Sequence, residues 1–178
     1  MQAIQPTHHT NFTYQPQTAK APASHNRKDE AFAALRLLKR YESWIGLKVQ
    51  SLKVLEHYLI ITSPQDWKIG QSPICYQSVF STCRKLNISE RQLRYAEKNL
   101  EDLGIVLRER SANEKRHAKR DKNGDLIEAY GLDLSPLLEV QEWIEDLQDR
   151  VEAEEREVRY LRREITKHRR MMTERLSR

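Results

Sequence analysis

The chain has 178 residues, which is enough for one domain of ordinary size and one further element. Charged residues make up 32% of the chain and hydrophobic residues 38%, so it is richer in charge than an average globular protein. The formal net charge of +5 suits a polyanionic partner. No apolar stretch approaches the ~20 residues of a membrane-spanning helix, and the polar N-terminus lacks the apolar core of a secretory signal. We therefore expect a cytoplasmic protein without a membrane partner.

The sequence carries no motif for catalysis or for a cofactor. We find no glycine-rich phosphate loop and no nucleophile motif, and glycine occurs only five times. Neither Cys75 nor Cys83 has a further cysteine or histidine at zinc-finger spacing. We therefore expect a protein that is not an enzyme, with no catalytic residue, no metal, no cofactor and no small-molecule substrate.

The first 73 residues change from a polar tail to two helices and a loop. Residues 1–26 contain three prolines, no acidic residue and no apolar period, so we expect a disordered tail. Apolar residues at helical spacing then predict one helix from Arg27 to Gly46 and another over residues 47–62, which Ser63-Pro64 ends. The second helix is apolar on more than one face and is expected to be the most buried. Residues 65–73 are typical of a loop.

Two helices are predicted close together between Val79 and Gly104. The first covers residues 77–86 and the second residues 90–103. Between them, Asn87 tolerates the left-handed conformation of a tight turn. Ser89 is a strong N-cap, and Gln92 three residues later completes a capping box. Helix, short turn and helix are the plan of a helix-turn-helix.

The second of these helices carries side chains suited to DNA. An α-helix fits the major groove, where Arg can read guanine and Gln or Asn can read adenine. Two stacked amphipathic helices with a charged outer face also occur in proteins that do not bind DNA. Asn99 is assigned to the same polar face as the predicted DNA-binding residues of this helix, which are Glu90, Arg91, Gln92, Arg94, Tyr95 and Lys98.

A basic β-hairpin is predicted after the second helix. Residues 105–110 are typical of a strand, and Asn123-Gly124 is a strong turn signal before a returning strand over residues 126–134. Residues 108–122 hold seven Lys or Arg and three acidic residues, a net charge of +4. Such a hairpin after a helix-turn-helix is a wing, which contacts backbone phosphate or the minor groove. The predicted DNA-binding residues of the wing are Asn113, Lys115, Arg116, Lys119 and Arg120.

The expected fold class is mainly α. A winged helix-turn-helix domain with a β-hairpin wing covers residues 27–134, and a long coiled-coil-like helix covers residues 135–178. Double-stranded DNA is the expected partner.

Two blocks of the sequence resemble the N-terminal domain of the plasmid replication protein C family. They are residues 91–104 and residues 115–137, and the second, with Arg-Asp-x-x-Gly and Ala-Tyr-Gly-x-Asp-Leu-Ser-Pro-Leu, is the more specific. The resemblance covers roughly residues 31–138. It implies a winged-helix domain that recognises a plasmid origin, with residues 90–103 as the recognition helix and residues 113–122 as the wing. It also implies that the origin lies within the gene of the protein and that family members continue into a second domain.

The C-terminal helix has a heptad pattern. Ser135-Pro136 is a predicted helix start, and position a is apolar in six successive heptads from Leu137 to Met172. Position d includes Glu154, His168 and Arg175, which weaken the apolar contact between two such helices. In a parallel dimer, three pairs between positions g and e have opposite charge, whereas the acidic first half and basic second half of the helix would suit antiparallel pairing. We expect a parallel homodimer through residues 137–172, with a lone or self-docked helix as the alternative.

Three functions remain open from the sequence. The first is a plasmid replication initiator-type protein that recognises origin DNA through the winged helix-turn-helix. The second is a winged-helix transcriptional regulator derived from the same family. The third is a coiled-coil adaptor without specific DNA binding, and the basic wing favours DNA binding over this alternative.

Overall fold

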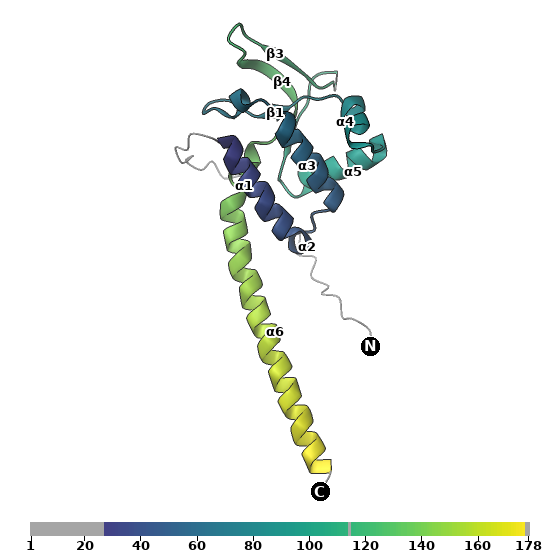
Figure 1. Cartoon of the computed structure of the whole chain (residues 1–178), viewed down its shortest axis with the longest axis vertical. Helices are drawn as coiled ribbons and strands as arrows, with labels where there is room; N and C mark the ends of the chain where they lie inside the picture. Colours follow the sequence, from purple (N-terminus) through teal and green to yellow (C-terminus); the bar gives the residue numbers. More distant parts are fainter. Residues whose placement is uncertain (1–26, 114, 177–178) are drawn as a thin grey trace. The chain divides into compact units, whose positions relative to one another are not determined.

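The computed structural model describes residues 27–113 and 115–176, so the predicted disordered tail lies outside the described residues. The chain divides into two compact units, with the boundary between Gln141 and Glu142. In its described part, the first unit contains helices α1 to α5 and a small antiparallel sheet, and the second is a single helical segment (Figure 1). The expectation of a mainly α protein is confirmed.

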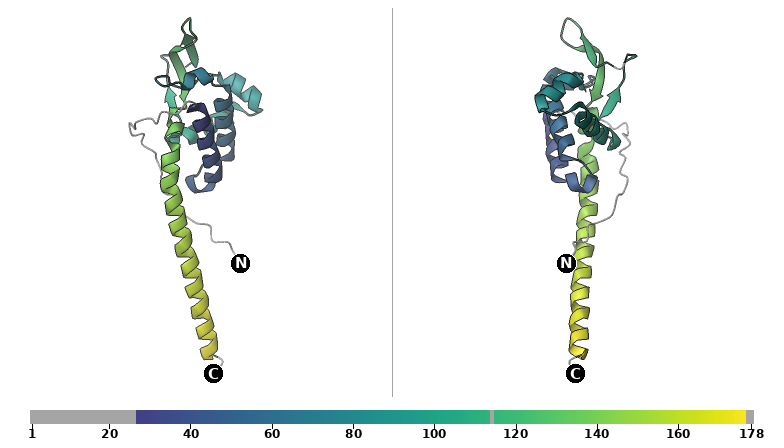
Figure 2. Two further views of the ribbon diagram at one scale, coloured as in Figure 1. Left: turned by 60° about the vertical axis from the view of Figure 1, so that its left-hand side comes forward. Right: turned by 90° about the vertical axis from the view of Figure 1, so that its right-hand side faces the viewer.

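Helices α1 (Arg27–Arg40) and α3 (Val49–Ile61) lie side by side in the first unit (Figure 2). The predicted helix up to Gly46 is interrupted, because α1 ends at Arg40 and a short helix α2 (Glu42–Ile45) follows. Gly46 closes α2 with φ of 71°, a left-handed conformation that glycine adopts without steric cost.

Helix α3 is the most buried helix of the first unit, as its sequence predicts. Apolar side chains on several of its faces are removed from water, since α1 packs on one side and α5 on another. The buried apolar residues of α3 are Leu52, Val54, Leu55, Tyr58 and Leu59.

The predicted helix, turn and helix are present as α4 (Val79–Leu86) and α5 (Glu90–Asp102). Asn87 occupies the left-handed region with φ of 53°, which lets the chain reverse between the two helices. The side chain of Ser89 accepts a hydrogen bond from the backbone of Gln92, and the side chain of Gln92 accepts one from the backbone of Ser89. The predicted capping box is therefore confirmed.

The sheet has the strand order β1-β4-β2, and β3 pairs with the first half of β4. Its strands are β1 (Ile74–Cys75), β2 (Leu107–Glu109), β3 (His117–Arg120) and β4 (Leu126–Asp133). Strands β3 and β4 form a hairpin at the predicted turn, where Gly124 has φ of 84°, and the predicted strand β2 pairs with the end of β4. The sequence did not predict β3, which lies in the basic segment between the two predicted strands. At Gly131 a Cβ atom would lie 2.1 Å from the carbonyl oxygen of Cys75, so only glycine lets β1 and β4 approach this closely.

The predicted loop after α3 contains a 3-10 turn, η1 (Pro64–Trp67), which Ser63 caps. Trp67 is 2% exposed and its indole N–H donates to Thr62. Asp66 is 1% exposed, so this turn places a carboxylate inside the first unit. The partner of that carboxylate lies on the hairpin.

The last helix begins differently from its prediction. Ser135 opens a 3-10 turn, η2 (Ser135–Leu138), and α6 (Val140–Leu176) follows. Ser135 does not cap a helix, because its hydroxyl and its backbone N–H both donate to Asp133. Leu137 and Val140, the first two apolar positions of the predicted heptad pattern, are 1% and 3% exposed.

No helix in the described ranges is both long and apolar enough to cross a bilayer.

Candidate nucleic-acid interface

Helix α5 turns one face inward and the other toward solvent. Leu93, Ala96 and Leu100 are buried and hold the helix against the rest of the first unit. All six residues that the sequence assigns to the outer face are exposed, namely Glu90, Arg91, Gln92, Arg94, Tyr95 and Lys98.

The exposed side chains of α5 form two local pairs. Arg94 donates to the carboxylate of Glu90 across 2.5 Å, and both side chains are more than half exposed. Arg91 lies over the ring of Tyr95, with 5.6 Å between the guanidinium carbon and the ring centroid. Because surface ion pairs contribute little, Arg94 can exchange this partner at small cost. Lys98 has no side-chain partner in the part of the chain that the structure describes.

Two polar residues of α5 have roles within the protein. The side-chain oxygen of Gln92 is used in the capping box, where it accepts from Ser89. Asn99 does not lie on the outer face as the sequence suggests. Its side chain accepts from the backbone of Lys48 and from the hydroxyl of Ser51, and donates to the backbone of Gly46. It therefore ties α5 to the turn before α3.

The hairpin presents three lysines to solvent. Lys115 precedes β3, Lys119 lies on β3, and Lys122 lies in the turn between the strands. Among the described residues, none of the three has a side-chain partner. Asn113 forms a turn at the base of the hairpin, where its side chain accepts from Ser111 and from the backbone of Lys115.

Arg116 is assigned to DNA by the sequence, but its guanidinium is turned into the protein. It donates to the carboxylate of Glu97 across 2.6 Å, and its side chain is only 9% exposed. Glu97 itself is 1% exposed and also accepts hydrogen bonds from Tyr58 and Arg108. Burial alone would raise the pKa of Glu97, but the charge of Arg116 and these hydrogen bonds outweigh it and lower the pKa. Glu97 is thus an ionised carboxylate inside the first unit.

This buried cluster joins four elements. Tyr58 comes from α3, Glu97 from α5, Arg108 from β2, and Arg116 from the residue before β3. Arg108 also forms an ion pair with Glu101, one turn further along α5. The cluster therefore fixes the base of the hairpin to the inner face of α5.

Arg120 is also engaged by a carboxylate of the protein. Its two terminal nitrogens donate to the two oxygens of Asp66, both across 2.8 Å, in a bidentate pair. Those hydrogen bonds with Asp66, together with one to the ring oxygen of Tyr76, raise the pKa of Arg120. Next to Asp66, the amide of Gln65 donates to the backbone of Asn123 and to Asp125 in the turn of the hairpin. The turn η1 thus holds the far part of the hairpin.

Sequence reasoning missed the two carboxylates that hold the hairpin. Glu97 lies between the buried positions Ala96 and Leu100 of α5, and a charged residue on that face is a signal for a buried ion pair. Asp66 lies in a segment assigned to a loop, and no local pattern marks it. Arg116 and Arg120 are conspicuous as basic residues of a wing, but the sequence does not reveal which of its basic residues have partners.

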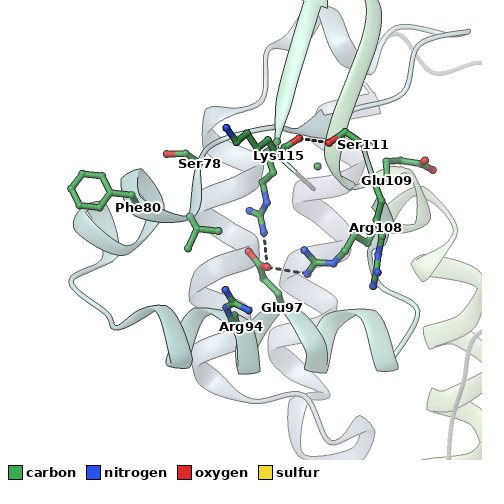
Figure 3. Close-up of a pocket in the computed structure, with 12 residues that line it drawn as sticks. Ser78, Phe80, Arg94, Glu97, Arg108, Glu109, Ser111 and Lys115 are labelled. Atoms are coloured by element: carbon green, nitrogen blue, oxygen red, sulfur yellow. Dashed lines mark hydrogen bonds and ion pairs between the residues drawn. The ribbon is translucent and has the colours of Figure 1, made fainter. Parts of the chain in front are cut away.

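A cleft of about 670 Å³ lies between α5 and the base of the hairpin (Figure 3). Glu97 and Arg108, which form an ion pair, line it together with Arg94 and Lys115. Five of its lining residues are basic and two are acidic, so the cleft has an excess of positive charge. The basic ones are Arg94, Arg108, Arg110, Lys115 and Arg116, and the acidic ones are Glu97 and Glu109.

The described residues offer no candidate metal centre, since no group of three or more His, Cys, Asp or Glu side chains comes together among them. The two thiols are poor nucleophiles. Burial raises the pKa of Cys75 to about 11 and also raises the pKa of Cys83.

Comparison with known proteins identifies the family. The model of the replication protein C N-terminal domain matches residues 8–178. A replication protein C from Sinorhizobium fredii is 38% identical over 83 residues, which are 47% of this chain and 20% of that protein. A second, from Rhizobium rhizogenes, is 27% identical over 151 residues, or 84% of this chain and 37% of that protein. No solved structure gives a significant match.

The two relatives are much longer than the region that they share with this chain, which spans at most 37% of their length. The family match, in contrast, extends over nearly the whole sequence, including both units of the structure. The resemblance seen in residues 91–104 and 115–137 is therefore confirmed, and the chain belongs to the replication protein C family through that family's N-terminal domain.

Proposed function

We propose that the first unit binds duplex DNA as a winged helix-turn-helix, with α5 as the recognition helix and the β3–β4 hairpin as the wing. The order α3, β1, α4, α5, β2 and hairpin supports this assignment. So does the sheet, in which β4 returns from the hairpin to lie between β1 and β2. The double helix is the only partner that the proposal requires.

The observation that carries the proposal is the distribution of positive charge that is exposed to solvent. On α5, Arg91, Arg94 and Lys98 face solvent, and on the hairpin the three lysines do so. Two other basic residues, Arg116 and Arg120, are held by carboxylates of the protein, so they position the hairpin and are not available to DNA. This division supports α5 and the hairpin lysines as one binding surface.

The two parts of this surface have different tasks in the proposal. The N-terminal half of α5 enters the major groove, where Arg91 and Arg94 contact base edges. Lys115, Lys119 and Lys122 contact phosphates, which adds affinity on any sequence. Asn113 shapes the turn that presents Lys115 and does not itself contact DNA.

Family membership supports a plasmid origin as the target, and thus a role in the start of plasmid replication. The chain acts without catalytic residues or a cofactor in this proposal, since a binding protein needs neither. A regulator would use the same domain on an operator in place of an origin.

A footprint with the full chain tests the proposal. The DNA should include the gene of the protein and the flanking plasmid sequence, with random duplex as competitor. We expect one discrete protected site inside or beside the gene. Protection at a promoter alone would favour the transcriptional regulator, and no protected site would favour the adaptor.

A further inference from the structure

We propose that α6 pairs with α6 of a second copy of this chain, parallel and in register, through residues 158–172. The inference concerns the second unit alone and does not depend on DNA binding by the first. It specifies which part of the helix can form the interface and in which direction the two copies run.

One face of α6 presents an apolar stripe to solvent. Val158, Leu161, Ile165 and Met172 are 45%, 49%, 53% and 59% exposed. They follow one another at the a and d positions of a heptad, which lie on one side of a helix. Four large apolar side chains that are aligned and exposed on one side of a helix are an interaction surface. We call these four residues the seam.

The structure shortens the interface that the heptad pattern predicts. Leu137 and Val140 are buried in the first unit and cannot meet a second copy. The predicted range of residues 137–172 is therefore wrong at its start.

Charges beside the seam favour a second copy in the parallel direction. In that arrangement position g of one helix meets position e of the next heptad on its partner, so Glu157 meets Arg162 and Glu164 meets Arg169. Each contact occurs twice by symmetry. Within the described part of the chain, neither Glu157 nor Arg162 has a side-chain ion pair, so both are available to the second copy.

The antiparallel direction brings like charges together. If Leu161 faces Ile165 of an antiparallel second copy, Glu164 lies beside Glu164 of that copy, and Arg162 lies beside Arg162. Two repulsive contacts then replace the attractive ones. Charged side chains in direct contact decide the direction. The attraction between the acidic half and the basic half of α6 matters less, because salt screens charges that are more than ~8 Å apart.

Polar residues at d positions limit the strength of the dimer. His168 interrupts the seam and lies 3.8 Å from Glu164 of its own helix, and Glu154 ends the apolar pattern before Val158. With a seam of four apolar residues, we expect monomer and dimer to exchange at micromolar concentration.

Sedimentation equilibrium of the full chain is the first test. We expect a mass that rises toward twice the 21.1 kDa of one chain as the concentration increases through the micromolar range. Leu161→Glu should abolish the increase. Tyr160→Glu is the matched control, since Tyr160 is 63% exposed on a neighbouring face and should leave dimerisation intact. A monomeric chain, or equal effects of the two variants, would overturn the proposal.

Charge exchange tests the contact itself. Glu157→Arg should weaken the dimer about tenfold, because an attractive contact becomes repulsive in two places. Adding Arg162→Glu should restore it, although positions 157 and 162 do not face each other within one helix. A double variant as weak as the single one would refute the parallel register.

A disulfide distinguishes the two directions. Ile165→Cys should form a covalent dimer under mild oxidation, because equivalent a positions are adjacent only in a parallel pair. Lys167→Cys, on the outer side of the helix, should give no more covalent dimer than the unmodified chain with its two native thiols. Equal yields from the two variants would exclude the parallel arrangement.

Discussion

The guanidinium of Arg116 donates to the carboxylate of Glu97 across 2.6 Å, and both side chains are almost completely removed from water. Glu97 lies on the inner face of α5, and Arg116 immediately precedes the first strand of the hairpin. The pair therefore fixes the two elements of the proposed DNA-binding surface to each other. A surface assembled in advance loses less conformational freedom when it binds.

Glu97→Gln should destabilise the first unit by about 3–5 kcal/mol, because the substitution leaves the charge of Arg116 buried without a counterion. Urea unfolding followed by circular dichroism measures this difference. Glu101→Gln is the matched control on the same helix. Its carboxylate is partly exposed and pairs with Arg108, which keeps Glu97 as a second partner. The control should cost about 1 kcal/mol or less, and equal effects of the two substitutions would contradict the special role of Glu97.

The stability of the protein should fall in acid partly through Glu97. Its pKa is lower in the folded protein than in the unfolded chain, so unfolding takes up a proton once the pH drops below about 4.3. The contribution of Glu97 is thus complete above that pH and is lost as the pH falls through the folded pKa. Urea unfolding between about pH 3 and 6 should give a smaller loss of stability for Glu97→Gln than for the unmodified chain. If the free energy of unfolding fell equally with pH in the two proteins, Glu97 would not titrate in this way.

The parts of the structure that the sequence predicts depend on neighbours close in the chain. The capping box joins Ser89 and Gln92, three residues apart, and Asn87 determines its own turn. The hairpin likewise follows from a turn signal at Asn123-Gly124. Such signals are local, so sequence patterns alone locate them.

The parts that the sequence did not predict depend on distant partners. Arg116 and Glu97 are 19 residues apart, and Arg120 and Asp66 are 54 apart. A basic run shows where the charges are but not which of them meet a carboxylate in the folded chain. The heptad pattern failed at Leu137 and Val140 for a similar reason, because an apolar side chain can enter the core of the same chain instead of a second copy.

Gly131→Ala should destabilise the first unit by about 1–3 kcal/mol or more, because the new methyl group would collide with the backbone of Cys75 on β1. Neither backbone can move without breaking the pairing of β1 with β4. Thermal unfolding is the measurement. Ile127→Ala, at an exposed position of the same strand, serves as the control and should have little effect. A change in melting temperature no larger than that of the control would show that the strands can separate to make room.

Neutralising the hairpin lysines should flatten the salt dependence of DNA binding. Lys115→Gln combined with Lys119→Gln should reduce the slope of log K against log salt concentration by about 0.9 for each phosphate that a lysine no longer neutralises. Affinity should fall equally on specific and random duplexes. Lys53→Gln, at an exposed position of α3, is the control outside the proposed surface and should leave the slope unchanged. An unaltered slope in the double variant would show that the hairpin lysines do not contact DNA phosphates.

Arg91 and Arg94 should determine which sequence is bound. Both side chains are exposed on the first two turns of α5, where a recognition helix meets base edges, and their present partners Tyr95 and Glu90 lie on the same helix. Arg91→Ala or Arg94→Ala should weaken binding to the footprinted site by about 1–3 kcal/mol, while binding to random duplex changes little. Arg36→Ala, on the exposed side of α1, should alter neither. Competition experiments at one salt concentration give both affinities for each variant. An equal reduction of affinity on the two duplexes would mean that the arginine contacts phosphate, and no reduction on either would place the interface away from α5.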